Sequence, residues 1–341
     1  MKVLVYFQPK SIRDNFEGMR LRKDIKGACE LNDITHTSNI FDTYDVAHFI
    51  SINDETKISD CIEADVPVVM SALMCESDPV TKMLIRAKDG TYSLRARALR
   101  VLNKVDMVLV PTIDAKNFLI NEGVTSQINV LSSGVNVSRF EAINENEIQV
   151  FRRYFSCKEN EHIAVIIGDY DDKKQLDRFF NVASKCQDVK FYHIGSSKAP
   201  AKVLERRIKK LKRKASKNVV LSTILDDDLF RSSLMNAEIF LSLNNRLFES
   251  ISLIEAMAAR NEIFVYSSHK ENPQYLTNLV HFASDCDELA KLINEFLNGT
   301  LSSCVDEAYE YAKKHSLFIN GQQLKQFYCD LYKSKGEKQN D

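Results

Sequence analysis

A glycine and two lysines in the second half of the chain have the spacing of a phosphate-binding turn. Gly168 follows the strand-like residues 162–167, and Lys173 and Lys174 begin the next helical pattern. A glycine lets the backbone turn tightly, and a lysine at a helix start can bind a diphosphate together with the unpaired backbone N–H groups there. This spacing predicts contact with a phosphorylated ligand.

Three acids occupy the same turn, namely Asp169, Asp171 and Asp172. Carboxylates beside a diphosphate would repel it. A weakened phosphate site and a solvated acidic turn therefore both fit this segment.

Two further segments could approach the same ligand. Gly195 and Ser196 end a strand-like run, where small residues would let a nucleotide come close, and a satisfied loop is the alternative. Glu249 and Glu255 flank the start of a helical pattern between two strand-like runs. A carboxylate in such a βαβ unit lies near the carboxyl edge of a parallel sheet, where open α/β folds bind nucleotides.

The elements that position these residues alternate between strand-like and helical along most of the chain. Alternation of this kind predicts parallel sheets covered by helices on both faces. At 341 residues the chain is long for one core, so two domains of about 150 residues each are expected. The polar residues 141–160 are expected to connect them, and the tail from residue 334 is predicted to be disordered because it is almost entirely polar and charged.

The sequence of residues 248–268, FESISLIEAMAARNEIFVYSS, resembles the characteristic motif of the retaining GT-B glycosyltransferases of family four. In that family a Glu, seven residues, then Glu-Ala-Met-Ala and Gly-x-Pro-Val line the sugar-nucleotide donor. Glu255 begins the matching Glu-Ala-Met-Ala. Three positions depart from the pattern, with Leu247 at the first Glu, Arg260 at the Gly and Glu262 at the Pro.

Other segments resemble the same family. Residues 133–140, SGVNVSRF, are similar to its interdomain segment, and Gly168 with Lys174 matches its phosphate-gripping Val-Gly-Arg and Lys-Gly, where Asp169 replaces the Arg. Gly18 is similar to a remnant of its glycine-rich loop. Leu73 stands where the family has a histidine.

The resemblance implies an α/β fold of two Rossmann-like domains facing each other, the GT-B arrangement. Residues 1–145 would form the acceptor-side domain, with a helix over 315–333 packing back on it, and 150–312 the donor domain. Lys173 and Lys174 would hold the donor diphosphate, Glu255 the ribose, and Glu249 the sugar as the catalytic group. The nucleotide sugar would be a substrate, with no cofactor and no metal required.

Composition limits the class of protein further. The net charge of −1 argues against a general nucleic-acid binder, and 44% hydrophobic with 27% charged residues is ordinary globular material. Eight scattered cysteines without a Cys-x-x-Cys indicate reduced thiols. No apolar run reaches the roughly 20 residues of a membrane span, so we expect a cytoplasmic protein. His48, on a strand-like run, is expected to be a core or rim histidine.

A basic stretch in the first half offers a peripheral membrane contact. Residues 80–103 are predicted to be a cationic amphipathic helix in which Arg86, Arg95, Arg97 and Arg100 are interleaved with apolar residues. Such a helix can lie on anionic lipid on the inner face of the plasma membrane. A solvated helix face is the alternative, and the basic residues 202–217 pose the same choice.

The function that the resemblance implies is transfer of a hexose from a nucleotide sugar, UDP-glucose-like, to an acceptor such as a membrane glycolipid or diacylglycerol. The chain resembles the divergent branch near the bacterial glucosyl-diacylglycerol synthases. The rival is an inactive GT-B protein that binds another transferase as a partner. Four departures favour the rival, because each is expected at the active-site cleft: Leu73, Asp169, Leu247 and Arg260. A nucleotide-sugar epimerase on the same fold would need the acid and histidine that are replaced.

Overall fold

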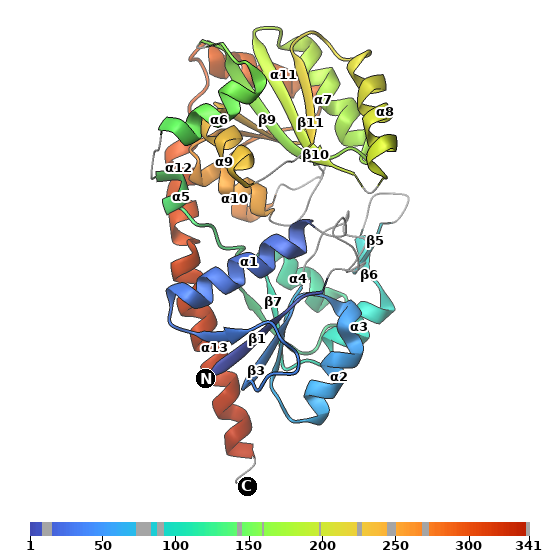
Figure 1. Cartoon of the computed structure of the whole chain (residues 1–341), viewed down its shortest axis with the longest axis vertical. Helices are drawn as coiled ribbons and strands as arrows, with labels where there is room; N and C mark the ends of the chain where they lie inside the picture. The colour runs from blue at the N-terminus through green and yellow to red at the C-terminus, as the bar shows by residue number, and fades with distance from the viewer. Residues whose placement is uncertain are drawn as a thin grey trace. The chain divides into compact units, whose positions relative to one another are not determined.

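The computed structural model describes residues 1–8, 16–72, 83–86, 92–141, 145–158, 160–197, 199–223, 227–243, 250–267 and 273–338. The chain divides into two compact units. The first comprises Met1–Val135, Leu247–Ile251 and His315–Asp341, and the second comprises Asn136–Arg246 and Ser252–Lys314. Each unit contains one six-stranded sheet. Figure 1 shows helices around the strands of each unit.

The first unit has a parallel sheet in the order β2-β1-β3-β4-β7-β8 and a separate antiparallel hairpin, β5-β6. Its strands are β1 (Lys2–Tyr6), β2 (Thr35–Thr37), β3 (Val46–Phe49), β4 (Val68–Ser71), β5 (Leu84–Arg86), β6 (Tyr92–Leu94), β7 (Met107–Val110) and β8 (Gln127–Val130). Its helices are α1 (Phe16–Leu31), the 3-10 turn η1 (Ile52–Asp54), α2 (Glu55–Glu63), α3 (Ala96–Leu102), α4 (Ile113–Asn121) and α13 (Leu317–Lys338).

Helices cover both faces of this first sheet because its central strands are apolar on both sides. Leu4 and Phe49 face a core shared with α2, α3 and α4. Val3 and Val5 face the opposite core, to which α1 and α13 contribute. Near-continuous burial of this kind is typical of parallel strands between two helical layers.

The second unit is built in the same way around a parallel sheet in the order β11-β10-β9-β12-β13-β14. Its strands are β9 (His162–Asp169), β10 (Val189–Ser196), β11 (Val219–Thr223), β12 (Ile239–Ser242), β13 (Glu262–Tyr266) and β14 (His281–Ala283). Its helices are α5 (Ser138–Glu141), α6 (Glu145–Phe155), α7 (Lys173–Lys185), α8 (Ala201–Lys212), α9 (Asp227–Asn236), α10 (Ile251–Ala258), η2 (Gln274–Leu276), α11 (Cys286–Leu297) and α12 (Val305–Lys314).

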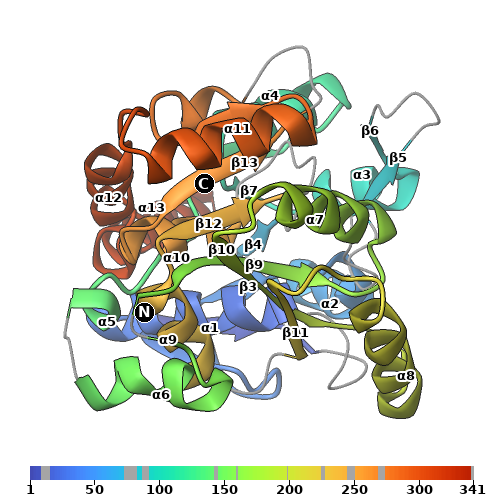
Figure 2. The same cartoon turned by 90° about the horizontal axis from the view of Figure 1, so that it is seen from above.

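The faces of this second sheet are also covered on both sides. Phe179 of α7 and Ile293 of α11 pack in one core with the central strands. Phe151 of α6 and Leu229 of α9 pack in the other. Figure 2 shows α7 and α11 on one side of the strands and α6 and α9 on the other. The strand order is that of a doubly wound nucleotide-binding sheet, and it reverses between β9 and β12.

The expected α/β fold with two parallel sheets is confirmed, and three local expectations are corrected. The predicted helix over residues 80–103 is wrong, because β5 and β6 form a hairpin and only α3 is helical. The polar connection at 141–160 contains the helix α6. The last helix continues to Lys338, into the tail expected to be disordered. Among the described residues, no helix is both long and apolar enough to cross a membrane.

Candidate functional site at the carboxyl edge of the second sheet

The carboxyl ends of β9 and β12 mark the point where the strand order of the second sheet reverses. Open parallel sheets bind ligands in the crevice that such a reversal creates. Gly168 and Asp169 end β9, and the chain continues directly into α7. The segment after β12, which holds Glu249 and Leu247, lies outside the described residues.

Two glycines make this edge unusually close-packed. Gly168 and Gly195 are register partners on β9 and β10, followed by the pair Asp169 and Ser196. A Cβ atom added to Gly195 would lie 2.5 Å from the carbonyl oxygen of Gly168. One added to Gly168 would lie 2.2 Å from Oε1 of Gln175. The contact at Gly195 is with backbone, so that position requires glycine, whereas a side chain at Gly168 would have to displace the buried Gln175 and His193.

The start of α7 supplies positive charge beside these glycines. The Asp172 side chain caps the helix by accepting from the Gln175 N–H at 3.0 Å. Lys173 and Lys174 are exposed in the first turn. The partial positive charge of a helix N-terminus adds to that of the two lysines. The predicted phosphate-binding residues Gly168, Lys173 and Lys174 are thus brought together on one turn.

Each acid of this turn is engaged by a neighbour. The Asp171 N–H donates to Oδ1 of Asp169 at 2.8 Å. The Asp171 carboxylate pairs with the Arg207 guanidinium and accepts from the Ser197 hydroxyl at 3.0 Å. Asp172 is the helix cap. These contacts hold the shape of the turn, and Asp171 is exposed within it.

Arg207 was missed by sequence reasoning, which interpreted the basic residues 202–217 as a charged outer face or a second lipid contact. It lies on α8, which follows β10, and its guanidinium also donates to the Tyr170 carbonyl at 3.1 Å. The signal that could have found it is its position in the helix after the Gly195 turn. It offsets the negative charge of Asp171, two residues after the Asp169 that replaces the family's arginine.

A buried histidine lies beneath the glycine pair. His193 is fully buried, and among the described residues neither ring nitrogen has a hydrogen-bond partner. Its ring packs against Tyr170 at 4.6 Å and Phe179 at 5.4 Å between centroids. Burial lowers the pKa of His193 to about 3. The ring is therefore neutral at physiological pH and acts as packing under Gly168.

Glu255 lies on α10, whose first residues follow the β12 end of the same sheet edge. The side chain is half-buried on the second turn of the helix. The neighbouring Ala256 and Met257 are buried and fix the face that α10 turns to the core. The structure therefore places Gly168, Gly195, Lys174 and Glu255 on elements that meet at one edge of the second sheet.

Two departures from the family motif lie at the other end of α10. Arg260 follows the helix and has a φ of 60°, the left-handed conformation that a glycine adopts easily at a helix C-terminus. Glu262 begins β13, at the amino edge of the sheet. The expectation that Arg260 falls at the active-site cleft is therefore wrong, because α10 carries the chain away from the carboxyl edge.

In the first unit, His48 is a core residue. Its Nδ1 is 2.6 Å from the Tyr328 hydroxyl, and its Nε2 is 2.7 Å from the Ser71 hydroxyl. Burial lowers its pKa to about 3. Gly18 is buried on α1, while the loop before that helix and Leu73 lie outside the described residues.

The basic residues of the first unit form an ion-pair cluster instead of one amphipathic stripe. Arg97 and Arg100 of α3 both pair with Glu55, at 3.3 and 3.1 Å. Hydrogen bonds from Arg100, followed by the charges of both arginines, lower the Glu55 pKa. Arg95 donates to the Leu84 carbonyl at 3.3 Å, and the Arg86 side chain lies outside the description. Asp89-Gly90, a hairpin signal, could have corrected the helix prediction.

The fold is shared with solved glycosyltransferases of the GT-B class. The Anabaena protein HepE in complex with UDP-glucose matches with a TM-score of 0.72 and 12% identity, over 97% of this chain and 100% of that one. A glycosyltransferase from Rickettsia africae matches with a TM-score of 0.67 and 13% identity, over 97% and 98%. At these identities the likeness concerns the fold.

One relative is similar to this chain in sequence as well as in length. The chain is 24% identical over 344 residues to the processive diacylglycerol alpha-glucosyltransferase of Acholeplasma laidlawii, covering 98% of this chain and 100% of the relative. No family model matches the chain. The chain is thus similar over nearly its whole length to a diacylglycerol glucosyltransferase, in agreement with the resemblance of its motifs. The inactive alternative receives no support from these comparisons.

Proposed function

We propose that this protein is a retaining glycosyltransferase that moves glucose from UDP-glucose to a diacylglycerol or glycolipid acceptor at a membrane surface. The observation that carries the proposal is the joint placement of the glycine pair and the α7 lysines where the strand order reverses. The relative that spans the whole chain is named for transfer of glucose to diacylglycerol, which supports this choice of donor sugar and acceptor.

The donor diphosphate is assigned to Lys173, Lys174 and the first N–H groups of α7. These groups concentrate positive charge where the diphosphate leaves. Stabilising the negative charge of the departing diphosphate is the main catalytic task in such a reaction. Glu255 would hold the ribose. Glu249 would contact the sugar as the catalytic carboxylate, in the segment that follows β12. With two lysines and a helix N-terminus available, the proposed reaction needs no metal ion at the diphosphate.

The acceptor side is assigned to the first unit. Arg97 and Arg100 have side chains 48% and 58% exposed, so they can reach anionic headgroups although Glu55 offsets part of their charge. In the second unit, α8 has no buried residue and carries basic residues in its last turn. Basic residues near an anionic surface contribute about 1 kcal/mol each, so peripheral binding to the cytoplasmic membrane is the proposed location.

Calorimetric titration with UDP, UDP-glucose and a GDP-sugar tests the donor assignment. We expect micromolar binding of the uridine nucleotides. Lys174→Met and Glu255→Gln should each weaken it about tenfold, which corresponds to about 1.4 kcal/mol. Lys291→Met is the matched control, because Lys291 is 74% exposed on α11 and pairs only locally with Glu295. Absence of nucleotide binding at millimolar concentrations would refute the proposed donor site.

A further inference from the structure

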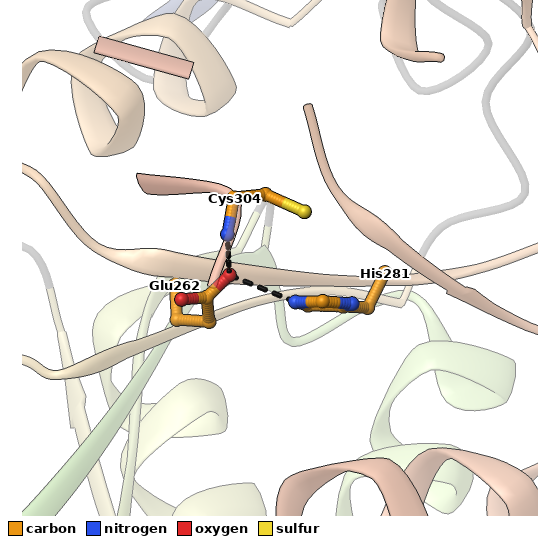
Figure 3. A group of neighbouring side chains, drawn as sticks. All are labelled: Glu262, His281 and Cys304. Atoms are coloured by element: carbon orange, nitrogen blue, oxygen red, sulfur yellow. Dashed lines mark hydrogen bonds and ion pairs between the residues drawn. The ribbon is translucent and has the colours of Figure 1, made fainter. Parts of the chain in front are cut away.

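Three side chains of zinc-ligand type meet at the amino edge of the second sheet, away from the proposed donor site. Glu262 begins β13, His281 begins β14, and Cys304 immediately precedes α12. One ligand atom from each residue lies within 4.8 Å of those of the other two. Figure 3 shows the three residues converging from these three segments. We propose that Glu262, His281 and Cys304 bind a divalent transition-metal ion of the zinc type.

The carboxylate is already oriented by groups that an incoming ion would leave in place. The Ser303 hydroxyl donates to Oε2 of Glu262 at 2.6 Å, and the Cys304 N–H donates to Oε1 at 2.9 Å. Glu262 is 1% exposed. Ligating carboxylates in metal sites are typically held by outer hydrogen bonds of this kind. The ion would replace only the contact between Glu262 Oε1 and His281 Nε2, which is 2.8 Å long.

The ligand types select the ion. Imidazole nitrogen, thiolate sulfur and carboxylate oxygen are the donors that zinc and similar borderline ions prefer, whereas magnesium and calcium prefer oxygen alone. Bond lengths of roughly 2.0–2.3 Å place the ligand atoms of a tetrahedral site about 3.3–3.8 Å apart. The present separations of up to 4.8 Å therefore close to that range by side-chain rotation of about 1 Å. A water would complete the four ligands.

Charge balance also favours a divalent ion here. Cys304 would bind the ion as a thiolate, and its thiol proton is released to solvent on binding. The ion, the thiolate and the Glu262 carboxylate then sum to zero charge, which a mostly buried site requires. The imidazole proton on Nε2 moves to Nδ1 when Nε2 becomes the ligand.

The site is structural in this proposal. It joins the first residues of β13 and β14 to the segment that enters α12, and the Phe264 ring packs against His281 at 5.1 Å between centroids. The residues proposed to bind the donor diphosphate lie at the opposite, carboxyl edge of the sheet. Loss of the ion should therefore lower the thermal stability of the protein without removing nucleotide binding.

Cobalt(II) provides a direct test, because a cobalt–thiolate bond gives a charge-transfer absorption band in the near ultraviolet. The full-length protein, stripped with chelator, is titrated with Co²⁺. We expect the band to saturate at one equivalent and to disappear when Zn²⁺ is added. Cys304→Ser should abolish the band, and His281→Asn should weaken cobalt binding at least tenfold.

Cys286→Ser is the matched control, since Cys286 is another partly exposed thiol of the same unit, at the start of α11. It should leave the band unchanged. Unfolding temperatures in chelator establish that each variant folds, and Zn²⁺ should raise that temperature in the parent and in Cys286→Ser but not in Cys304→Ser. A parent protein without the band, or a band that survives Cys304→Ser, would overturn the proposal.

Discussion

Gly195 and Gly168 face each other on neighbouring strands so closely that a Cβ on Gly195 would lie 2.5 Å from the Gly168 carbonyl oxygen. The contact is with backbone, so no side-chain rotation relieves it. A Cβ on Gly168 would also meet the buried side chains of Gln175 and His193. The absence of both side chains therefore lets β9, β10 and the layer beneath them pack closely at the carboxyl edge of the second sheet.

The Gly195→Ala variant should lose both stability and donor binding. The added methyl group must displace the β9 backbone, which typically costs about 1–3 kcal/mol, and the displacement moves the turn that leads to Lys174. Denaturant unfolding and UDP titration measure the two effects. Gly299→Ala is the control, because a Cβ there meets nothing within 4 Å, although its φ of 70° adds a smaller local cost. Unchanged UDP affinity in Gly195→Ala would contradict the close-approach argument.

Arg260 shows how this chain tolerates a departure from the family pattern. Its φ of 60° is costly for a residue with a Cβ, while its guanidinium lies 3.7 Å from the centre of the Tyr309 ring and pairs with Asp306 at 3.0 Å. Both Arg260→Gly and Arg260→Ala remove these contacts, but only glycine relieves the backbone. Arg260→Gly should therefore unfold with a free energy about 1 kcal/mol higher than Arg260→Ala. Equal stabilities in urea unfolding would count against the backbone explanation.

The two buried histidines predict loss of stability in mild acid. Burial lowers the pKa of His48 and of His193 to about 3, against about 6.5 in an unfolded chain. The folded state thus prefers the neutral rings. Their contribution is complete above about pH 6.5 and declines as the pH falls toward 3, by about 1.4 kcal/mol per pH unit and histidine.

The His193→Leu variant should take up one proton fewer than the parent on unfolding in mild acid. Urea unfolding at pH 7, 6 and 5 gives the slope, and the variant should fall less steeply than the parent even if its stability at pH 7 differs. Phe179→Leu is the control for altered packing around His193, because the Phe179 ring contacts that histidine at 5.4 Å between centroids and carries no titratable group, and it should keep the parent slope. Parallel curves for the parent and His193→Leu would contradict the assignment.

The Glu55 cluster allows a signed test of membrane binding. Arg100→Gln removes a positive charge from α3, and Glu55→Gln removes the negative charge that offsets Arg97 and Arg100. At about 1 kcal/mol per charge, sedimentation with anionic phosphatidylglycerol vesicles should show binding about fivefold weaker for the first variant and about fivefold stronger for the second. If both variants changed vesicle binding in the same direction, or neither changed it, the proposal that this face binds the membrane would be contradicted.

Sequence reasoning recovered the parallel sheets because buried parallel strands are apolar runs that alternate with helical periods. It also predicted that Gly168 and Lys174 lie at a strand end and a helix start, because this placement depends on local chain geometry. It missed the hairpin of β5 and β6, because basic and apolar residues spaced through the segment imitate a helix. It also placed α6 in a connection, because only Phe151 of that helix is buried.

Contacts between segments far apart in the chain could not be predicted from the sequence pattern. The pairing of Arg207 with Asp171 joins residues on two different elements, as does the cluster of Glu262, His281 and Cys304. Residue spacing along the chain does not indicate either of these contacts, since the order of the strands in the sheet decides which segments meet. The position of Arg260 was misjudged for another reason, because α10 runs to Ala258 and so carries Arg260 toward the amino edge of the sheet.

The most direct test of the proposed activity is transfer of labelled glucose from UDP-glucose to diacylglycerol in anionic vesicles, with the anomeric configuration of the product determined by NMR. We predict an α-linked glucosyl lipid, formed with release of UDP, and a rate at least tenfold lower in Lys174→Met but unchanged in Lys291→Met. A β-linked product would contradict retention of configuration. Absence of any glucosyl lipid, with UDP-glucose bound normally, would contradict the acceptor assignment and leave the donor site as the part that stands.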